Sequence, residues 1–118
     1  MNLDDVQRLL TRYIERRWVR RLLVLRWIDQ AGGKIEWDRL RQMCSLQWYP
    51  LSFYVLYVQL FRDGLLVTKW LYSDQPDEAD AWAHVVIPDD VYPILSAQLA
   101  VFGAEIEKLL ESPPRWET

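Results

Sequence analysis

The chain has 118 residues, enough for one domain with a real hydrophobic core, and its composition (51% apolar, 26% charged) excludes a disordered chain. No apolar run approaches the ~20 residues of a membrane span, and the first residues lack the basic start and apolar segment of a signal peptide. The lone Cys44 excludes an internal disulfide. We therefore expect a cytoplasmic protein with no membrane partner.

The composition is rich in arginine and in aromatic residues. Arginine outnumbers lysine eleven to three and asparagine occurs once, which is compatible with a thermophilic source. The 16 aromatic residues, seven of them tryptophan, exceed what a small core needs. We expect some of them at a partner surface, where tryptophan, tyrosine and arginine are enriched.

Positive charge is concentrated at the start of the chain. Residues 1–26 contain seven arginines against three carboxylates, a balance of +4, so with a net charge of −3 the remaining residues carry −7. This asymmetry predicts one cationic face on an otherwise acidic protein. The arginines either contact phosphates, which guanidinium groups bind through paired hydrogen bonds, or form a solvated helix face. The candidate phosphate contacts are Arg8, Arg12, Arg16, Arg17, Arg20 and Arg21.

The first helical segment spans residues 3–31, which contain neither proline nor glycine and repeat apolar residues at helical spacing. Because the apolar arc rotates after Trp18, we expect one long helix or two nearly collinear helices. The second half should face the core of the domain, and the first half should face something else. Gly32-Gly33 should end the segment, since glycine adopts the left-handed conformation that closes a last helical turn.

The middle of the chain predicts a short strand at residues 34–36 and a helix over residues 37–44, with Cys44 in the core. Pro50 suits the first turn of a further helix over residues 50–63. Its core positions are expected to be Phe53, Tyr57, Leu60 and Phe61. Removing these leaves a largely apolar outer face, formed by Leu51, Ser52, Tyr54, Val55, Val58, Gln59 and Arg62.

Residues 65–72 and 81–87 are rich in β-forming residues and flank an acidic turn, which predicts a β-hairpin with a long tip. Asp89 or Asp90 should cap a last helix that ends near Glu111, followed by a tail over residues 112–118. The apolar residues of this helix step by four and three, a rhythm that suits pairing with the same helix of a second copy. The predicted homodimer seam is Leu95, Leu99, Phe102, Ile106 and Leu109.

The predicted order is helix, short strand, short helix, turn, helix, glycine and two-stranded hairpin. Together with residues 60–66 (LFRDGLL), which match the pattern L-x-x-x-G-L-hydrophobic, it resembles the winged helix-turn-helix superfamily over residues 18–88. The flanking helices at residues 3–17 and 89–111 resemble those of small dimeric regulators of the multiple-antibiotic-resistance, arsenic-responsive and phenolic-acid-responsive types. The resemblance implies one mainly α domain with a β-hairpin wing, double-stranded DNA as ligand and dimerisation through the terminal helices.

The sequence departs from DNA-binding members of that superfamily in two places. Their third helix offers polar side chains to base edges, whereas here only Ser52, Gln59 and Arg62 could form such hydrogen bonds. The wing tip carries Asp74, Asp77, Glu78 and Asp80 without a positive charge, which would oppose attraction to phosphates unless the tip is held away from DNA.

No pattern of catalytic or metal-ligating residues is present. His84 is the one histidine, Gly32-Gly33 is not followed by the Gly-Lys-Ser/Thr of a phosphate-binding loop, and the adjacent pairs Asp4-Asp5 and Asp89-Asp90 suit helix caps. We predict no enzyme activity, no metal and no cofactor.

Two functional hypotheses follow. The first is a dimeric, transcription-regulator-type DNA-binding protein that contacts phosphates through the arginine-rich first helix. The second is a winged-helix interaction module that docks on another protein through Leu51, Tyr54, Val55 and Val58. A basic helix beside a winged helix favours the first.

Overall fold

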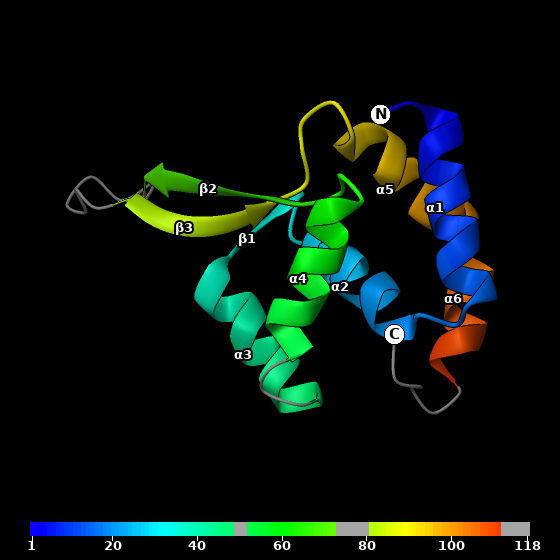
Figure 1. Cartoon of the computed structure of the whole chain (residues 1–118), viewed down its shortest axis with the longest axis horizontal. Helices are drawn as coiled ribbons and strands as arrows, with labels where there is room; N and C mark the ends of the chain where they lie inside the picture. The colour runs from blue at the N-terminus through cyan, green and yellow to red at the C-terminus, as the bar shows by residue number, and fades with distance from the viewer. Residues whose placement is uncertain (49–51, 73–80, 112–118) are drawn as a thin grey trace.

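The computed structural model of the protein describes residues 1–48, 52–72 and 81–111. These residues form a mainly helical fold with a small antiparallel sheet (Figure 1). In this part of the chain, no helix has both the length and the apolar character needed to span a membrane. The elements are α1 (Leu3–Glu15), α2 (Val19–Gln30), β1 (Lys34–Glu36), α3 (Trp37–Gln47), α4 (Ser52–Arg62), β2 (Val67–Tyr72), β3 (Ala81–Val86), α5 (Tyr92–Val101) and α6 (Gly103–Leu110).

The sheet has the strand order β1-β3-β2, with both neighbouring pairs antiparallel. β2 pairs with β3 from Val67 opposite Val86 to Tyr72 opposite Ala81, which confirms the predicted pairing of the two strands. β1 adds Ile35 opposite Val85, which confirms the predicted short strand. The acidic tip at residues 73–80 lies outside the described residues.

The helices form two groups joined by α2 (Figure 1). α1 packs against α5 and α6 at one end of the molecule, α3 and α4 pack together beside the sheet, and α2 contacts members of both groups. One hydrophobic core runs through all of them. The expectation that the first half of the N-terminal segment faces away from this core is wrong, because α1 buries Val6, Leu10 and Tyr13 in it.

The N-terminal segment is broken after Glu15, so it is neither one helix nor two collinear ones: α1 and α2 run in different directions (Figure 1). The Trp18 N–H donates to the Tyr13 carbonyl at 2.8 Å, and the Arg17 N–H donates to the Ile14 carbonyl at 3.1 Å. These two bonds form a Schellman motif, which requires a left-handed residue where Arg17 stands (φ 57°). Periodicity does not reveal this stop because glycine, the usual residue there, is absent.

The ends of α2 and α4 show the same motif with glycine in the left-handed position. The Gly33 N–H donates to the Ile28 carbonyl at 2.8 Å and the Leu65 N–H to the Leu60 carbonyl at 3.0 Å, while Gly32 (φ 88°) and Gly64 (φ 80°) supply the turn. The predicted helix ends at these glycines are confirmed.

Two predicted details of the later helices are wrong. No aspartate side chain caps the helix after Pro88: α5 begins after Val91 without a side-chain cap, and Pro93 lies in its first turn. The last helix is also interrupted at Phe102, so that α5 and α6 are separate.

A buried cluster joins α1, α2 and the end of α4. The Tyr13 hydroxyl donates a hydrogen bond to Asp63, and the same carboxylate lies 3.8 Å from the Arg21 guanidinium. The Arg21 guanidinium lies over the Trp18 indole, 3.6 Å from the ring centre, and its side chain is 7% exposed. We call these four residues the Arg21 cluster. Burial, together with the hydrogen bond and the charge of Asp63, raises the pKa of Tyr13 well above its ordinary value of 10.0.

Replacing Arg17 with glycine should raise the free energy of unfolding by about 0.5–1 kcal/mol, because a left-handed backbone is strained for every residue with a Cβ atom. The matched control is Arg16→Gly, because Arg16 has right-handed helical dihedrals (φ −83°) and glycine should there lower stability. Urea denaturation measures the free energy of unfolding of both variants. A destabilised Arg17→Gly variant would contradict the left-handed backbone conformation at Arg17.

Replacing Asp63 with alanine should lower the free energy of unfolding by about 3 kcal/mol, because the buried Arg21 charge and the Tyr13 hydroxyl lose their acceptor. The control is Asp38→Ala, which removes an exposed ion pair with Arg41 at 3.1 Å and should cost less than ~0.5 kcal/mol. Equal losses in the two variants would show that the Arg21 cluster does not hold the helices together.

Cys44 is fully buried on α3, as expected, and burial raises the pKa of its thiol from 9.0 to about 12. The unfolded chain therefore loses this proton at lower pH than the folded chain, so stability is complete below pH 9 and falls as the pH rises from 9 towards 12. Over pH 9–10, Tyr13 contributes equally to wild type and to Cys44→Ala, so Cys44→Ala should show the flatter stability profile. Identical slopes of unfolding free energy against pH in wild type and Cys44→Ala would contradict the raised pKa of the thiol.

Candidate nucleic-acid interface

The exposed cations of α1 lie on the helix face opposite its buried residues. Arg8, Arg12 and Arg16 are exposed, whereas Val6 and Leu10 on the other side are fully buried. An open groove of about 370 Å³ follows this face and is lined by Gln7, Arg8, Thr11, Arg12, Glu15 and Arg16. Three of the six predicted phosphate contacts are therefore available together on α1.

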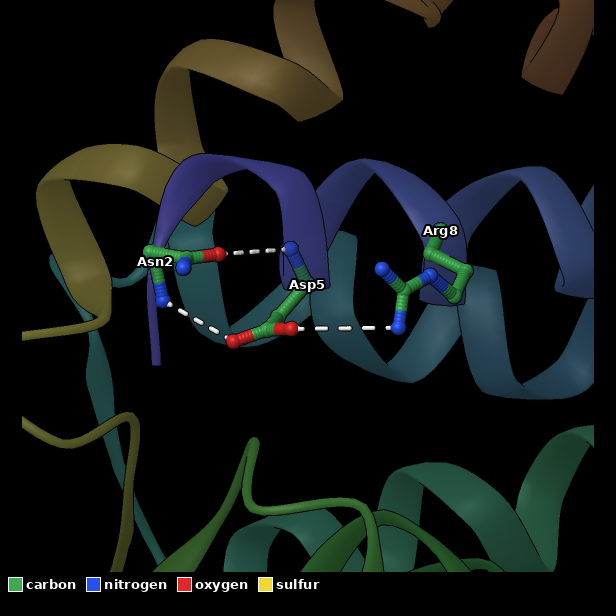
Figure 2. Close-up of polar contacts among 3 residues, drawn as sticks. All are labelled: Asn2, Asp5 and Arg8. Atoms are coloured by element: carbon green, nitrogen blue, oxygen red, sulfur yellow. Dashed lines mark hydrogen bonds and ion pairs between the residues drawn. The ribbon is translucent and has the colours of Figure 1, made fainter.

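Asp5 ties Arg8 to the first turn of α1 (Figure 2). The Asp5 N–H donates to Asn2 Oδ1 at 2.9 Å and the Asn2 N–H donates to Asp5 Oδ2 at 3.2 Å, so Asp5 takes part in a helix cap as predicted. The second Asp5 oxygen lies 4.0 Å from the Arg8 guanidinium. Since both side chains are exposed, this ion pair is weak, and a phosphate can replace Asp5 as the partner of Arg8.

The arginines after the break do not continue the α1 face. Arg17 is half-buried in the connection, and Arg20 is half-buried on α2 with its guanidinium 5.5 Å from the ring centre of Trp48. Arg21 is buried in the Arg21 cluster. The prediction that Arg21 contacts phosphate is therefore wrong, because its guanidinium is held inside the protein by Asp63 and Trp18.

The outer face of α4 is more apolar than predicted. Tyr54, Val55 and Val58 are exposed as expected, together with Arg62. Phe61 is 51% exposed, so its placement in the core is wrong, whereas Leu56, 3% exposed, is a core residue of α4. Tyr57, also expected in the core, is half-buried, and Leu51 lies outside the described residues.

Two predicted base contacts are not presented to a ligand. Ser52 is 8% exposed and faces the core, and Gln59 is half-buried with its Oε1 atom shut away from solvent. The prediction that both lie on the outer face is wrong, because the buried face of α4 is rotated towards them. This buried face contains Ser52, Phe53, Leu56 and Leu60. Of the predicted polar contacts on α4, only Arg62 is exposed.

Other exposed groups near α4 were not singled out from the sequence. Trp70 on β2 is 69% exposed, and Arg39 and Arg41 are exposed on α3, the helix that precedes α4. For the exposed Phe61, the signal in the sequence was its i, i+7 spacing from Tyr54, which places both on one face of α4.

The predicted homodimer seam points into the chain's own core. Leu95, Leu99 and Ile106 are buried, and Phe102 and Leu109 pack against the core. The apolar rhythm of four and three is satisfied by α1 and α2 of the same chain, so in this fold the predicted seam is not available to a second copy.

His84 lies half-buried on β3, opposite Glu36 of β1 and Lys69 of β2. Among the described residues, no three histidine, cysteine, aspartate or glutamate side chains come together in a group that could hold a metal ion. The chemistry that these surfaces offer is therefore that of exposed cations and exposed aromatic rings.

No family model matches the chain, and no curated protein matches it. Among solved structures, it is similar to the organohalide-sensing transcriptional regulator RdhR in its 2,4-dichlorophenol-bound form, with a TM-score of 0.53 and 15% identity over 98% of this chain and 72% of that one. The ligand-free form of that regulator aligns with a TM-score of 0.47 and 14% identity over the same shares. The neighbour is a transcriptional regulator, and at this identity the likeness establishes a shared fold alone.

Proposed function

We propose that this protein is a DNA-binding regulator of transcription, built on a winged helix-turn-helix. The observation that carries the proposal is the order α2-β1-α3-α4-β2-β3 with a β1-β3-β2 sheet, which is consistent with a winged helix. The likeness to the fold of a solved transcriptional regulator supports it. In this arrangement α4 takes the place of the helix that enters the major groove. Such a role is compatible with the cytoplasmic location expected from the sequence.

Phosphate contacts are assigned to the exposed arginines. Arg8, Arg12 and Arg16 form a cationic face on α1, and Arg62 adds a cation at the end of α4. Each arginine that neutralises a phosphate releases a bound counterion, so an acidic protein can still bind DNA through a local cationic face.

We further propose a homodimer formed through the end of the molecule that carries α1, α5 and α6 (Figure 1). Because the predicted seam is buried, the contacts are assigned to apolar residues that remain exposed there: Leu3, 45% exposed, and Val101, 67% exposed. A two-fold interface of this kind would leave α4 and the sheet of both copies accessible.

A second candidate function is a protein-interaction module. It is favoured by a group of exposed apolar side chains on α4, because a monomer normally exposes such residues singly. The group consists of Tyr54, Val55, Val58 and Phe61. In this alternative, α4 docks on another protein.

Fluorescence anisotropy with a labelled mixed-sequence duplex of about 25 base pairs separates the two functions. Affinity should fall steeply with salt, and Arg12→Ala should reduce the slope of log K against log salt by about 1. The matched control is Arg26→Ala, because Arg26 forms an ion pair with Glu107 and should leave the slope unchanged. An absence of binding both to this duplex and to its separated strands in ~50 mM salt would reject the DNA-binding proposal in favour of the interaction module.

A further inference from the structure

Aromatic rings of α3 and α4 form a continuous row, in which two rings are half-buried against the core and two are exposed. Trp37 lies with its ring centre 6.5 Å from that of Tyr54 and 5.0 Å from that of Tyr57, and Tyr57 stacks on Phe61 at 6.0 Å. We call these four residues the aromatic row. The Tyr57 hydroxyl is hydrogen-bonded to Thr68 Oγ1 at 2.5 Å, which joins the row to β2. Trp70 follows two residues later and shares a sheet face with Thr68.

The rings of this surface are unusually open to solvent. Tyr54 is 45% exposed, Phe61 51% and Trp70 69%, although large aromatic side chains gain most from burial. Val55 and Val58 are exposed between Tyr54 and Phe61. The surface therefore combines flat, accessible rings with small apolar side chains.

A DNA duplex offers little to such a surface. Its bases present their edges in the grooves, where specificity comes from hydrogen bonds, and their flat faces are covered by stacking within the helix. Ser52 and Gln59, which were expected to read base edges, are turned inward. Unpaired bases, in contrast, expose flat faces that stack on aromatic side chains whatever their sequence.

Exposed arginines lie near both ends of the row. α4 contains no carboxylate in Ser52–Arg62, and the carboxylate that follows it, Asp63, is occupied by Tyr13 and Arg21. Arg62 is exposed at one end of the row. Near the other end, Arg41 lies one helical turn after Trp37, paired with Asp38 at 3.1 Å in an exposed contact that a phosphate can replace.

We propose that the aromatic row and Trp70 bind unpaired nucleotides, so that this protein prefers single-stranded or locally melted DNA to intact duplex. Bases stack on Tyr54, Phe61 and Trp70, and Arg62 binds the phosphates. The inference rests on the proposed DNA-binding function and names the form of DNA that α4 and β2 select.

The test compares oligo(dT) of about 20 nucleotides with a duplex of equal length, by anisotropy at one salt concentration. Wild type should bind the single strand more tightly, and Trp70→Ala should weaken that binding about tenfold while leaving duplex binding unchanged. Trp70→Phe keeps a ring and should restore most of the affinity. Leu46→Ala is the control for loss of apolar surface, because Leu46 is 85% exposed on α3 and lies outside the aromatic row, and equal thermal midpoints show that the variants are folded.

The outcomes separate this inference from the proposed function. Duplex binding as tight as single-strand binding, or equal weakening by Trp70→Phe and Trp70→Ala, would overturn the inference and leave the DNA-binding function intact. Binding to neither form of DNA would overturn both, and would leave the aromatic row to a protein partner.

Discussion

Arg21 is a buried cation, and the positions of three helices follow from how its charge is accommodated. Its guanidinium lies against Trp18 and near Asp63, and the same carboxylate accepts the hydrogen bond of Tyr13. Removing a charge from water is costly unless partners surround it, so α1, α2 and the end of α4 must meet where these partners meet. This constraint fixes which side of α1 faces solvent, and thereby where Arg8 and Arg12 lie.

The same cluster separates two surfaces of different chemistry. On α1 the exposed side chains include arginines, whose positive charge acts over a distance. Around α4, exposed aromatic rings act only in contact, where they lose water. Because Arg21 and Arg20 are engaged with Trp18 and Trp48, they do not extend the cationic face from α1 to α4. A ligand that used both surfaces would have to follow the molecule from one helix to the other.

The terminal helices illustrate how one apolar pattern can serve two purposes. The seam of α5 and α6 has the spacing of a helix that pairs with a partner, and the partners are α1 and α2 of the same chain. A small domain exposes much of its surface, so a chain of this length gains stability by covering its own core with every available helix. The apolar residues left outside, such as Val101, are then the ones open to a second copy.

Local signals in the sequence determined most of the elements: the helix ends at Gly32 and Gly64, the short strand Lys34–Glu36, the pairing of two β-rich segments and the burial of Cys44. Each depends on a preference of neighbouring residues for one backbone conformation or one spacing. Tertiary structure alone decided the stop at Arg17, the inward turn of Arg21, Ser52 and Gln59, and the exposure of Phe61. The buried and exposed sides could not be predicted locally because a helix can rotate about its axis at little local cost. Which side is buried therefore depends on partners far away in the chain, such as Asp63 for Arg21.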